Sequence, residues 1–507
     1  MRLLLDTSVI IPLEDSSAIL EESLAQVSRL VMEHGHLLLV HPSSLDDINR
    51  DMDEKRRLIS LSRIQKYPLL SGPPIPTKDD LENLNLDQRN DHDRVDNELL
   101  YAIYRDAANI LITEDRRLHK KAERIGLADR VHYVQQAANF LSRIYASREE
   151  IALPNIQEIF LHNLDLNTEF FDSLRNDYSG FDDWFREAAR EGRSAWAVYD
   201  EGGNLGAIAI YKEEQDPRVT NDHRALPGKV LKLSTFKVGE TIRGRKIGEL
   251  LLKCAFRYAS RNKFEHIYLT MQVGKQDFLK DLCTDFGFIY FGEYNEDQVF
   301  VKSQPGVPPS DLFSALEYHK RFYPHFRCDE QIQKFIVPIR PEFHRILFPD
   351  IQNQLTQPTL FGPGNIQDGS PPAAAGNAIK QAYLCHARIK NINPGDILIF
   401  YRSRDEMALT TVGIVESVYD IADPDKILEL VSKRTVYTFE EIQKMAERRT
   451  KVILFRTAVH LPKLIKSEWL SEELGILSPI QSIRQITDEA FRRLIGESEI
   501  SNCFYAD

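Results

Sequence analysis

Residues 239–248 read GETIRGRKIG and stand between two segments with clear patterns. The residues before them, 230–238, read VLKLSTFKV, which predicts a strand. After them, apolar side chains recur at the spacing of one helix face, at Ile247, Leu250, Leu251, Cys254 and Tyr258. A basic, glycine-containing turn that opens a helix can hold a phosphate, because backbone N–H groups and the helix dipole point at the anion. An exposed basic helix start has the same pattern, so the turn alone leaves both interpretations open.

The segments around this turn indicate the fold in which it lies. Residues 195–199 and 205–211 predict a hairpin, and residues 266–270 predict a further strand. Together with the turn, these segments resemble the GNAT acetyltransferase fold over about residues 155–303. The resemblance implies a mixed sheet that binds acetyl-CoA, with the pantetheine arm beside Phe236 and Val238. It assigns the pyrophosphate of acetyl-CoA to Arg243, Gly244, Arg245, Lys246, Ile247 and Gly248.

Two positions depart from the GNAT pattern. Lys246 stands where the family usually has glycine, so it either obstructs the close approach of the backbone or adds a charge for the phosphate. Cys283 stands where many members have a tyrosine that protonates the leaving CoA thiolate. A thiol would also serve as that acid, but a small cysteine filling the core is equally consistent. The candidates for a general base are Glu240, Asp285 and Tyr290.

Acidic residues follow the predicted strands of the N-terminal segment. Residues 2–8 read RLLLDTS, a buried parallel strand that ends in Asp6. A second strand, 36–40, leads to a helix expected to start at a serine cap, with Asp46 and Asp47 in its first turn. Asp93 and Asp96 precede a helical stripe, and the strand 110–113 ends at Asp115. Open α/β sheets place their sites at the carboxyl ends of strands, although each acid by itself also suits a cap or a solvated surface.

Residues 1–145 resemble the PIN domain, a small α/β nuclease fold found in VapC-like toxins. The resemblance implies that Asp6, Asp47, Asp96 and Asp115 bind Mg²⁺ or Mn²⁺ and activate water for phosphodiester hydrolysis. In an alternative assignment of the four acids, Asp46 takes the place of Asp47, or Asp93 takes the place of Asp96. Such a cluster needs a cation, because closely spaced carboxylates repel one another.

The C-terminal segment predicts a small, mostly β domain. Strands are expected at 334–340, 396–401, 411–416 and 452–459, and a capping box at Thr438 opens a helix. Residues 330–497 resemble the PUA-like superfamily, nearest its ASCH and EVE branches, which commonly binds RNA or a modified base. Phe400, Tyr401 and Arg402 would then contact a nucleotide; the alternative is that they belong to the barrel core.

The chain of 507 residues is too long for one ordinary core. We expect a multidomain α/β and α+β protein with a PIN-like α/β sheet, a GNAT-like mixed sheet and a small PUA-like β-barrel. The expected domains are 1–148 (PIN-like), 152–304 (GNAT-like), 305–332 (linker and helix) and 333–507 (PUA-like). Residues 352–377, rich in Gln, Asn, Pro, Gly and Ala, are expected to form a long loop.

The composition, with 42% hydrophobic and 28% charged residues, excludes fibrous, mostly disordered and polytopic membrane classes. The five widely spaced cysteines indicate reduced thiols, and we expect a cytoplasmic location without membrane contact. A net charge of -12 argues against indiscriminate binding of polyanions.

The leading hypothesis is a toxin-like or stress-linked, Mg²⁺- or Mn²⁺-dependent endoribonuclease with an acetyl-CoA-binding GNAT domain and an RNA-reading PUA-like domain. The first alternative is an N-acetyltransferase acting on RNA or a protein amine, with the PIN-like domain as an RNA-binding scaffold. The second is a non-catalytic RNA-binding regulator. The expected partners are RNA, with DNA also open, and an inhibitory antitoxin protein. The oligomeric state is left open.

Overall fold

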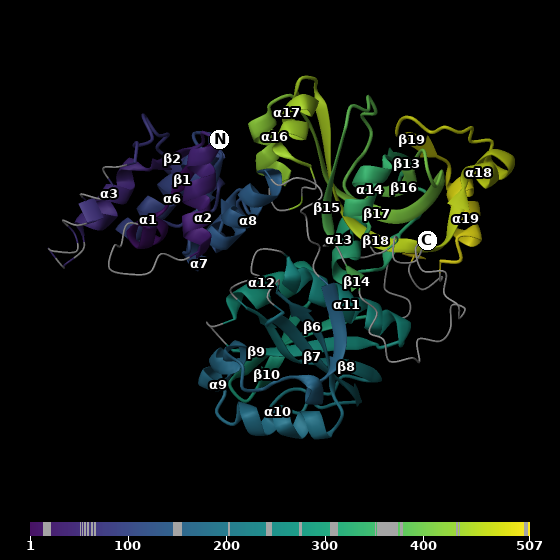
Figure 1. Cartoon of the computed structure of the whole chain (residues 1–507), viewed down its shortest axis with the longest axis horizontal. Coiled ribbons are helices and arrows are strands. Elements are labelled where there is room, and N and C mark those ends of the chain that lie inside the picture. Colours follow the sequence, from purple (N-terminus) through teal and green to yellow (C-terminus); the bar gives the residue numbers. More distant parts are fainter. Residues whose placement is uncertain are drawn as a thin grey trace. The chain divides into compact units, whose positions relative to one another are not determined.

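A computed structural model describes most of the chain (Figure 1). The residues outside the description are 14–21, 51, 53, 55–56, 58–59, 62–63, 65–66, 146–154, 201–202, 240–245, 273–275, 305–312, 350, 352–373, 376–378, 432–433, 435–436, 501–504 and 507. The chain forms two compact units. The first comprises Met1–Ile151 and Asp420–Val452, and the second Ala152–Tyr419 and Ile453–Asp507.

The first unit contains a four-stranded parallel sheet in the order β2-β1-β3-β4. Its strands are β1 (Arg2–Leu5), β2 (Leu37–Val40), β3 (Ile110–Ile112) and β4 (Val131–His132). The N-terminal helices are α1 (Thr7–Leu13), α2 (Glu22–Glu33), α3 (Pro42–Asn49), α5 (Lys78–Asn83), α6 (Asp91–Tyr104), α7 (Arg116–Arg124) and α8 (Val134–Tyr145). The central strands are apolar on successive residues because helices cover both faces of a parallel sheet. α3 begins at Pro42 after the cap His41, so the expected serine cap is wrong and Asp47 lies beyond the first turn.

Two helices from the C-terminal part of the sequence pack in this first unit. They are α16 (Pro424–Val431) and α17 (Phe439–Ala446), the latter opened by the predicted capping box at Thr438. The buried Glu429 carboxylate accepts a hydrogen bond from Asn109 Nδ2 at 2.7 Å and pairs with Arg130 at 3.2 Å. Burial raises the pKa of Glu429 to about 7 even though Arg130 opposes the shift. The assignment of all of 333–507 to one C-terminal domain is therefore wrong for 420–452, since these contacts join distant parts of the sequence.

The second unit contains an eight-stranded sheet in the order β10-β11-β9-β8-β7-β6-β5-β14. Its strands are β5 (Asn155–Phe160), β6 (Ser194–Tyr199), β7 (Leu205–Gln215), β8 (Lys229–Val238), β9 (His266–Gln272), β10 (Ile289–Tyr294), β11 (Asp297–Ser303) and β14 (Ala374–Ala375). α11 (Ile247–Arg261) and α12 (Asp277–Asp285) share one core with this sheet. α9 (Asp172–Asp177) and α10 (Phe181–Arg190) belong to a separate core cluster with Ala195, Ile208 and Ile210. The helices thus cover two faces of the sheet (Figure 1).

A six-stranded sheet completes the second unit, in the order β15-β18-β17-β16-β13-β19. Its strands are β13 (Lys334–Ile339), β15 (Lys380–Cys385), β16 (Ile397–Arg402), β17 (Ala408–Ile421), β18 (Thr450–Lys466) and β19 (Arg484–Ile486). The helices α13 (Ala315–Phe322), α14 (Pro341–Leu347), α18 (Ser467–Leu474) and α19 (Asp488–Glu497) and the short pair β12 (Phe326–Arg327) and β20 (Tyr505–Ala506) accompany it. Among the described residues, the strand order runs from β15 at one end to β19 at the other, and the small PUA-like β-barrel stays a prediction. Most of the loop expected at 352–377 lies outside the described residues.

No helix in the described ranges combines the length and apolar character needed to cross a bilayer.

Candidate functional site

The parallel strands β8 and β9 separate toward their carboxyl ends. Their ladder runs from Val230 opposite His266 to Leu233 opposite Leu269 and includes no later pair. β8 nevertheless continues to Val238 and β9 to Gln272, while β8 stays paired with β7 throughout. Within the described residues, the last part of β8 therefore has one backbone edge that is not paired with β9. Such an edge at the carboxyl end of parallel strands suits an extended ligand, which can pair with the strand.

Phe236 and Val238 lie on this separated part of β8 and are half-buried against the core beneath α11. Gly248, in the first turn of α11, lies close to both side chains. A Cβ atom on Gly248 would stand 2.9 Å from Leu282 Cδ2, 3.7 Å from Phe236 and 3.9 Å from Val238. A side chain at this position would therefore need Leu282 to shift, because α11 packs closely against β8 and α12.

The turn before α11 is described only at its end. Glu240, Arg243, Gly244 and Arg245 lie outside the described residues, so their predicted roles stay predictions. Lys246 precedes α11 with φ +56° and ψ 26°, a left-handed conformation that favours glycine. This conformation gives a physical reason for the glycine that the GNAT pattern usually has at this position.

Two residues at the start of α11 contact β15. Lys246 Nζ donates a hydrogen bond to the backbone oxygen of Lys380 at 2.9 Å. The buried Glu249 carboxylate accepts a hydrogen bond from the backbone N–H of Lys380 at 2.6 Å. The side chain of Ile247 is buried in the core. The first backbone N–H groups of a helix have no partner within the helix, and they can bind an anion.

Cys283 lies in α12 with its side chain completely buried in the same core. Burial strongly raises the pKa of the thiol. An acid that protonates a leaving group must reach that group, and this side chain reaches only core residues. The packing therefore matches the core-filling alternative and contradicts the proton-donor assignment.

The candidates for a general base are only partly defined. Asp285 makes ion pairs with Arg456 at 2.8 Å and with Lys380. Burial would raise the pKa of Asp285, but Arg456 and Lys380 outweigh it and hold this pKa well below its usual range. Such a carboxylate is a weak base, so Asp285 is a structural ion-pair partner. Tyr290 on β10 is 53% exposed.

The carboxylate of Asp6 is the centre of a hydrogen-bond network in the first unit. It accepts hydrogen bonds from the backbone N–H of Thr7 at 2.7 Å, from Ser8 Oγ at 2.6 Å and from Thr113 Oγ1 at 2.8 Å. Asp6 follows β1, and Thr113 directly follows the neighbouring strand β3. The parallel sheet thus brings the ends of two strands together around one carboxylate.

The other three predicted acids lie within electrostatic range of Asp6 or of one another. Burial raises the pKa of Asp96 to about 6, and the charges of Asp115 and Asp6 raise it further, although Lys121 opposes the shift. Burial also raises the pKa of Asp47. The charge of Asp6 adds to this rise, whereas Arg50 and His92 lower the pKa. The fold therefore gathers negative charge at one edge of the sheet.

Cationic and backbone groups of the chain bind these acids. Lys121 Nζ donates to Asp93 at 2.8 Å and to Asp96 at 3.0 Å. Arg50 and His92 contact Asp47 at 3.2 and 3.1 Å, Arg94 pairs with Asp46 at 2.8 Å, and Asp115 caps α7. Across the part of the chain that the structure describes, no three His, Cys, Asp or Glu side chains are grouped closely enough to hold a metal ion. Within the described residues, ion pairs and hydrogen bonds of the chain itself thus hold the predicted acids, and these acids do not form a metal-binding group.

The predicted nucleotide contacts of the C-terminal sheet are core residues. Phe400 and Tyr401 are completely buried, and Arg402 is nearly so. They lie on β16, a central strand between β13 and β17, and Arg402 Nε donates to Asp405 at 2.9 Å. Side chains covered on both faces of a sheet have no surface on which a base could stack. The prediction of nucleotide contacts is wrong for this arrangement, and the core alternative describes it.

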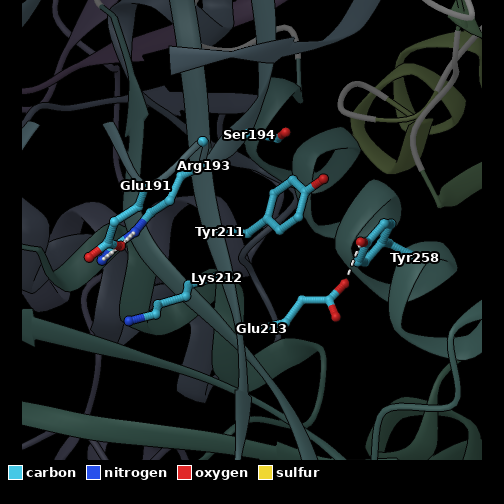
Figure 2. Close-up of a pocket in the computed structure, with 8 residues that line it drawn as sticks. Glu191, Arg193, Ser194, Tyr211, Lys212, Glu213 and Tyr258 are labelled. Atoms are coloured by element: carbon cyan, nitrogen blue, oxygen red, sulfur yellow. Dashed lines mark hydrogen bonds and ion pairs between the residues drawn. The ribbon is translucent and has the colours of Figure 1, made fainter. Parts of the chain in front are cut away.

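A pocket of about 270 Å³ lies near the other end of α11 (Figure 2). Its lining includes Arg193, Lys212, Tyr211, Glu213 and Tyr258, and Tyr258 donates to Glu213 at 2.6 Å. Tyr258 follows Ile247 by eleven residues in this helix. A rise of about 1.5 Å per residue puts the two roughly 16 Å apart, so this pocket is separate from the opening between β8 and β9. These five residues lie on β7, on α11 and in the turn before β6. The three segments are far apart in the sequence, so no local sequence pattern could predict this pocket.

Comparisons with known proteins agree with the GNAT part of the sequence analysis. Residues 157–288 match the model of the acetyltransferase (GNAT) family. No match was found among curated proteins.

Several solved structures are similar to parts of the chain. ASCH from Zymomonas mobilis has 13% identity and a TM-score of 0.25, covering 32% of this chain and 94% of its own. A putative acyl-CoA N-acyltransferase from Klebsiella pneumoniae has 14% identity and a TM-score of 0.21, covering 30% and 97%. The PaiA N-acetyltransferase from Thermoplasma acidophilum, in complex with coenzyme A, has 14% identity and a TM-score of 0.20, covering 27% and 80%. Residues 157–288 of this longer, multidomain chain are thus similar to the acetyltransferase (GNAT) family.

Proposed function

We propose that the chain is an N-acyltransferase that uses acetyl-CoA or a closely related acyl-CoA at the opening between β8 and β9. The observation that carries this proposal is the separation of these parallel strands beyond Leu233 and Leu269, next to the start of α11. The match of residues 157–288 to the GNAT family supports it. The alternative of an acyl-transferring enzyme thus replaces the ribonuclease as the leading hypothesis.

The residues of the chain have distinct tasks in this proposal. The unpaired edge of β8 around Phe236 and Val238 would pair with the pantetheine arm, as an added strand does. The first turn of α11 would meet the pyrophosphate with its N–H groups, and Gly248 permits the close packing behind it. Acetyl-CoA supplies an activated thioester: the acceptor nitrogen bonds to the acetyl carbon, the C–S bond breaks, and the thiolate leaves and takes up a proton. We infer an amine of RNA or of a protein as acceptor.

Calorimetric titration of the full chain with acetyl-CoA tests the first step. We expect saturable binding near one acetyl-CoA per chain, with competition by free CoA and none by acetate. Incubation with radiolabelled acetyl-CoA and either total cellular RNA or a mixture of cellular proteins then tests transfer. No heat of binding up to millimolar acetyl-CoA would overturn the proposal. Binding without label in either acceptor would leave an acetyl-CoA sensor and remove the transferase.

A second candidate function concerns the first unit. Burial raises the pKa of Asp96 to about 6, the charges of Asp115 and Asp6 add to the rise, and Lys121 opposes it. Closely spaced carboxylates of this kind favour a bound cation. We propose divalent-metal-dependent hydrolysis of RNA, or of DNA, as the secondary activity of this edge. Carboxylates suit Mg²⁺ or Mn²⁺, but the described positions do not converge on one ion, so we assign no catalytic step to a metal.

Incubation of the full chain with total cellular RNA and with single-stranded DNA, each with Mn²⁺, Mg²⁺ or EDTA, tests this second function. We expect discrete cuts that require the metal and disappear in Asp6→Asn and Asp115→Asn. Asp129→Asn, an acid of the same unit outside the predicted set, is the matched control and should keep the cuts. Cleavage that survives in Asp6→Asn, or intact nucleic acid in every reaction, would exclude a nuclease site at these acids.

A further inference from the structure

Three basic side chains form a row across the GNAT sheet, at a place that the proposed acyltransferase site does not use. Lys212 on β7 lies directly opposite Lys232 on β8. In the ladder between β6 and β7, Ala195 lies opposite Ile210, and this register extended by two residues puts Arg193 opposite Lys212. Residues directly opposite each other share a face of the sheet. In Figure 2, Arg193 and Lys212 point to one side of the strands, and Tyr211 and Glu213 point to the other.

The charges in this row are only partly compensated. Lys212 and Lys232 are both half-buried, and among the described residues neither ammonium group has a hydrogen-bond or ion-pair partner. Lys232 lies over the ring of Tyr268, with Nζ 5.5 Å from the ring centre. Two like charges directly opposite each other destabilise a sheet, so this pair costs free energy in the absence of an anion.

The neighbouring acids are already engaged. Glu191 pairs with Arg193 at 2.7 Å. Glu214 accepts a hydrogen bond from the hydroxyl of Tyr268 at 2.7 Å. Burial lowers the pKa of Lys232, and the charges of Arg193 and Lys212 lower it further, whereas only Glu214 opposes the shift. Glu191 thus compensates Arg193, and Glu214 also accepts a hydrogen bond from Tyr268, so the ammonium groups of Lys212 and Lys232 are left without an ion-pair partner of their own among the described residues.

We propose that Arg193, Lys212 and Lys232 bind the phosphate group of a small phosphorylated ligand or free phosphate. Arg193 and Lys212 line the pocket of about 270 Å³, together with Glu191 and Glu213, and this volume has room for a phosphate and part of the group that carries it. Lys232 is not among the lining residues and joins the site from the neighbouring strand, where it lies opposite Lys212. Guanidinium and ammonium groups provide the charge-assisted hydrogen bonds that a phosphate accepts. An anion between Lys212 and Lys232 would also relieve their repulsion.

This site is distinct from the acetyl-CoA site. Lys232 lies in the part of β8 that is still paired with β9, opposite Tyr268. Six residues separate it from Val238 along this strand. At about 3.3 Å per residue, the separation along the strand is roughly 20 Å. The proposal therefore stands or falls independently of acyl transfer.

Thermal unfolding of the full chain, with inorganic phosphate or adenosine monophosphate at constant ionic strength, tests the site. The test variants are Lys212→Gln and Lys232→Gln. The matched control is Lys229→Gln, which removes a lysine of the same strand that faces the other side and pairs with Glu213 at 3.0 Å. Lys246→Gln tests whether the response arises at the start of α11.

We expect phosphate to raise the Tm of the wild type, of Lys229→Gln and of Lys246→Gln. In Lys212→Gln and Lys232→Gln, the affinity should fall about tenfold or more, since each lysine supplies a charged hydrogen bond. The same two variants should have a higher Tm than the wild type without phosphate, because the repulsion is removed. A larger response to adenosine monophosphate, lost in the same two variants, would identify the ligand as a nucleotide. An undiminished response in both variants, or none in the wild type, would overturn the proposal.

Discussion

Replacing Arg456 by methionine is expected to lower the free energy of unfolding of the second unit by about 3–5 kcal/mol, the usual cost of breaking a buried ion pair on one side. Arg456 on β18 is completely buried. Its Nε donates to Glu416 at 2.5 Å and its Nη2 to Asp285 at 2.8 Å. The guanidinium carbon also lies 4.9 Å from the ring centre of Phe286. Methionine would fill much of the volume but leave two carboxylates without their shared cation.

Urea unfolding, followed by circular dichroism, measures this effect. Arg493→Met is the control, because Arg493 pairs with Glu473 at the surface and its loss should cost less than about 1 kcal/mol. Adding Asp285→Asn and Glu416→Gln to Arg456→Met should recover part of the loss, since the unpaired charges are then removed. Equal losses of unfolding free energy in Arg456→Met and Arg493→Met would show that the buried ion pairs stabilise the protein no more than the surface pair does.

Replacing Gly248 by leucine is expected to weaken acetyl-CoA binding at least about tenfold, which corresponds to about 1.4 kcal/mol or more. Already the Cβ of such a residue would stand 2.9 Å from Leu282 Cδ2 and under 4 Å from Phe236 and Val238. The larger side chain must displace the start of α11 from β8. The proposal places the pyrophosphate at the start of α11 and the pantetheine arm along β8, so this displacement would disturb both contacts. Calorimetric titration with acetyl-CoA gives the change in Kd directly.

Gly496 in α19 provides the matched control, because a Cβ on this helical glycine would meet nothing within 4 Å. Gly496→Ala should leave acetyl-CoA binding unchanged and stabilise its helix by up to about 1 kcal/mol. The double variant Gly248→Ala with Leu282→Ala should bind more tightly than Gly248→Leu, as the space is restored. Unchanged affinity in Gly248→Leu would mean that the cofactor does not use the start of α11.

The elements of the GNAT segment were predictable because they depend on neighbours in the sequence. The strand predicted at 230–238 is β8 (Lys229–Val238), and the apolar stripe that starts at Ile247 is α11. The sequence placed Gly248 at the start of this helix, but its close contact with Leu282 depends on the packing of α12. Short-range patterns of this kind record the hydrogen bonding and burial of one element.

The roles of Cys283, Phe400 and Tyr401 were not predictable from their types. An apolar or aromatic residue suits a binding surface and a core equally well, and the structure puts all three in cores. The acids of the first unit are ambiguous in a similar way, because an acid suits a metal site, a helix cap or a solvated surface. Their gathering at one edge follows from strand order, but the ion pairs of Lys121 with Asp93 and Asp96 depend on how α7 packs beside α6.

By itself, the sequence determined the local elements and the positions where glycine, carboxylate or lysine enters them. Only the tertiary structure decided that Arg456 meets Asp285, 171 positions away, and that Asn109 meets Glu429, 320 positions away. It also decided that Lys212 lies opposite Lys232 on neighbouring strands. The physical reason is that strand register and helix packing bring these charges together, while the pattern of each segment records only whether its own residues are polar or apolar.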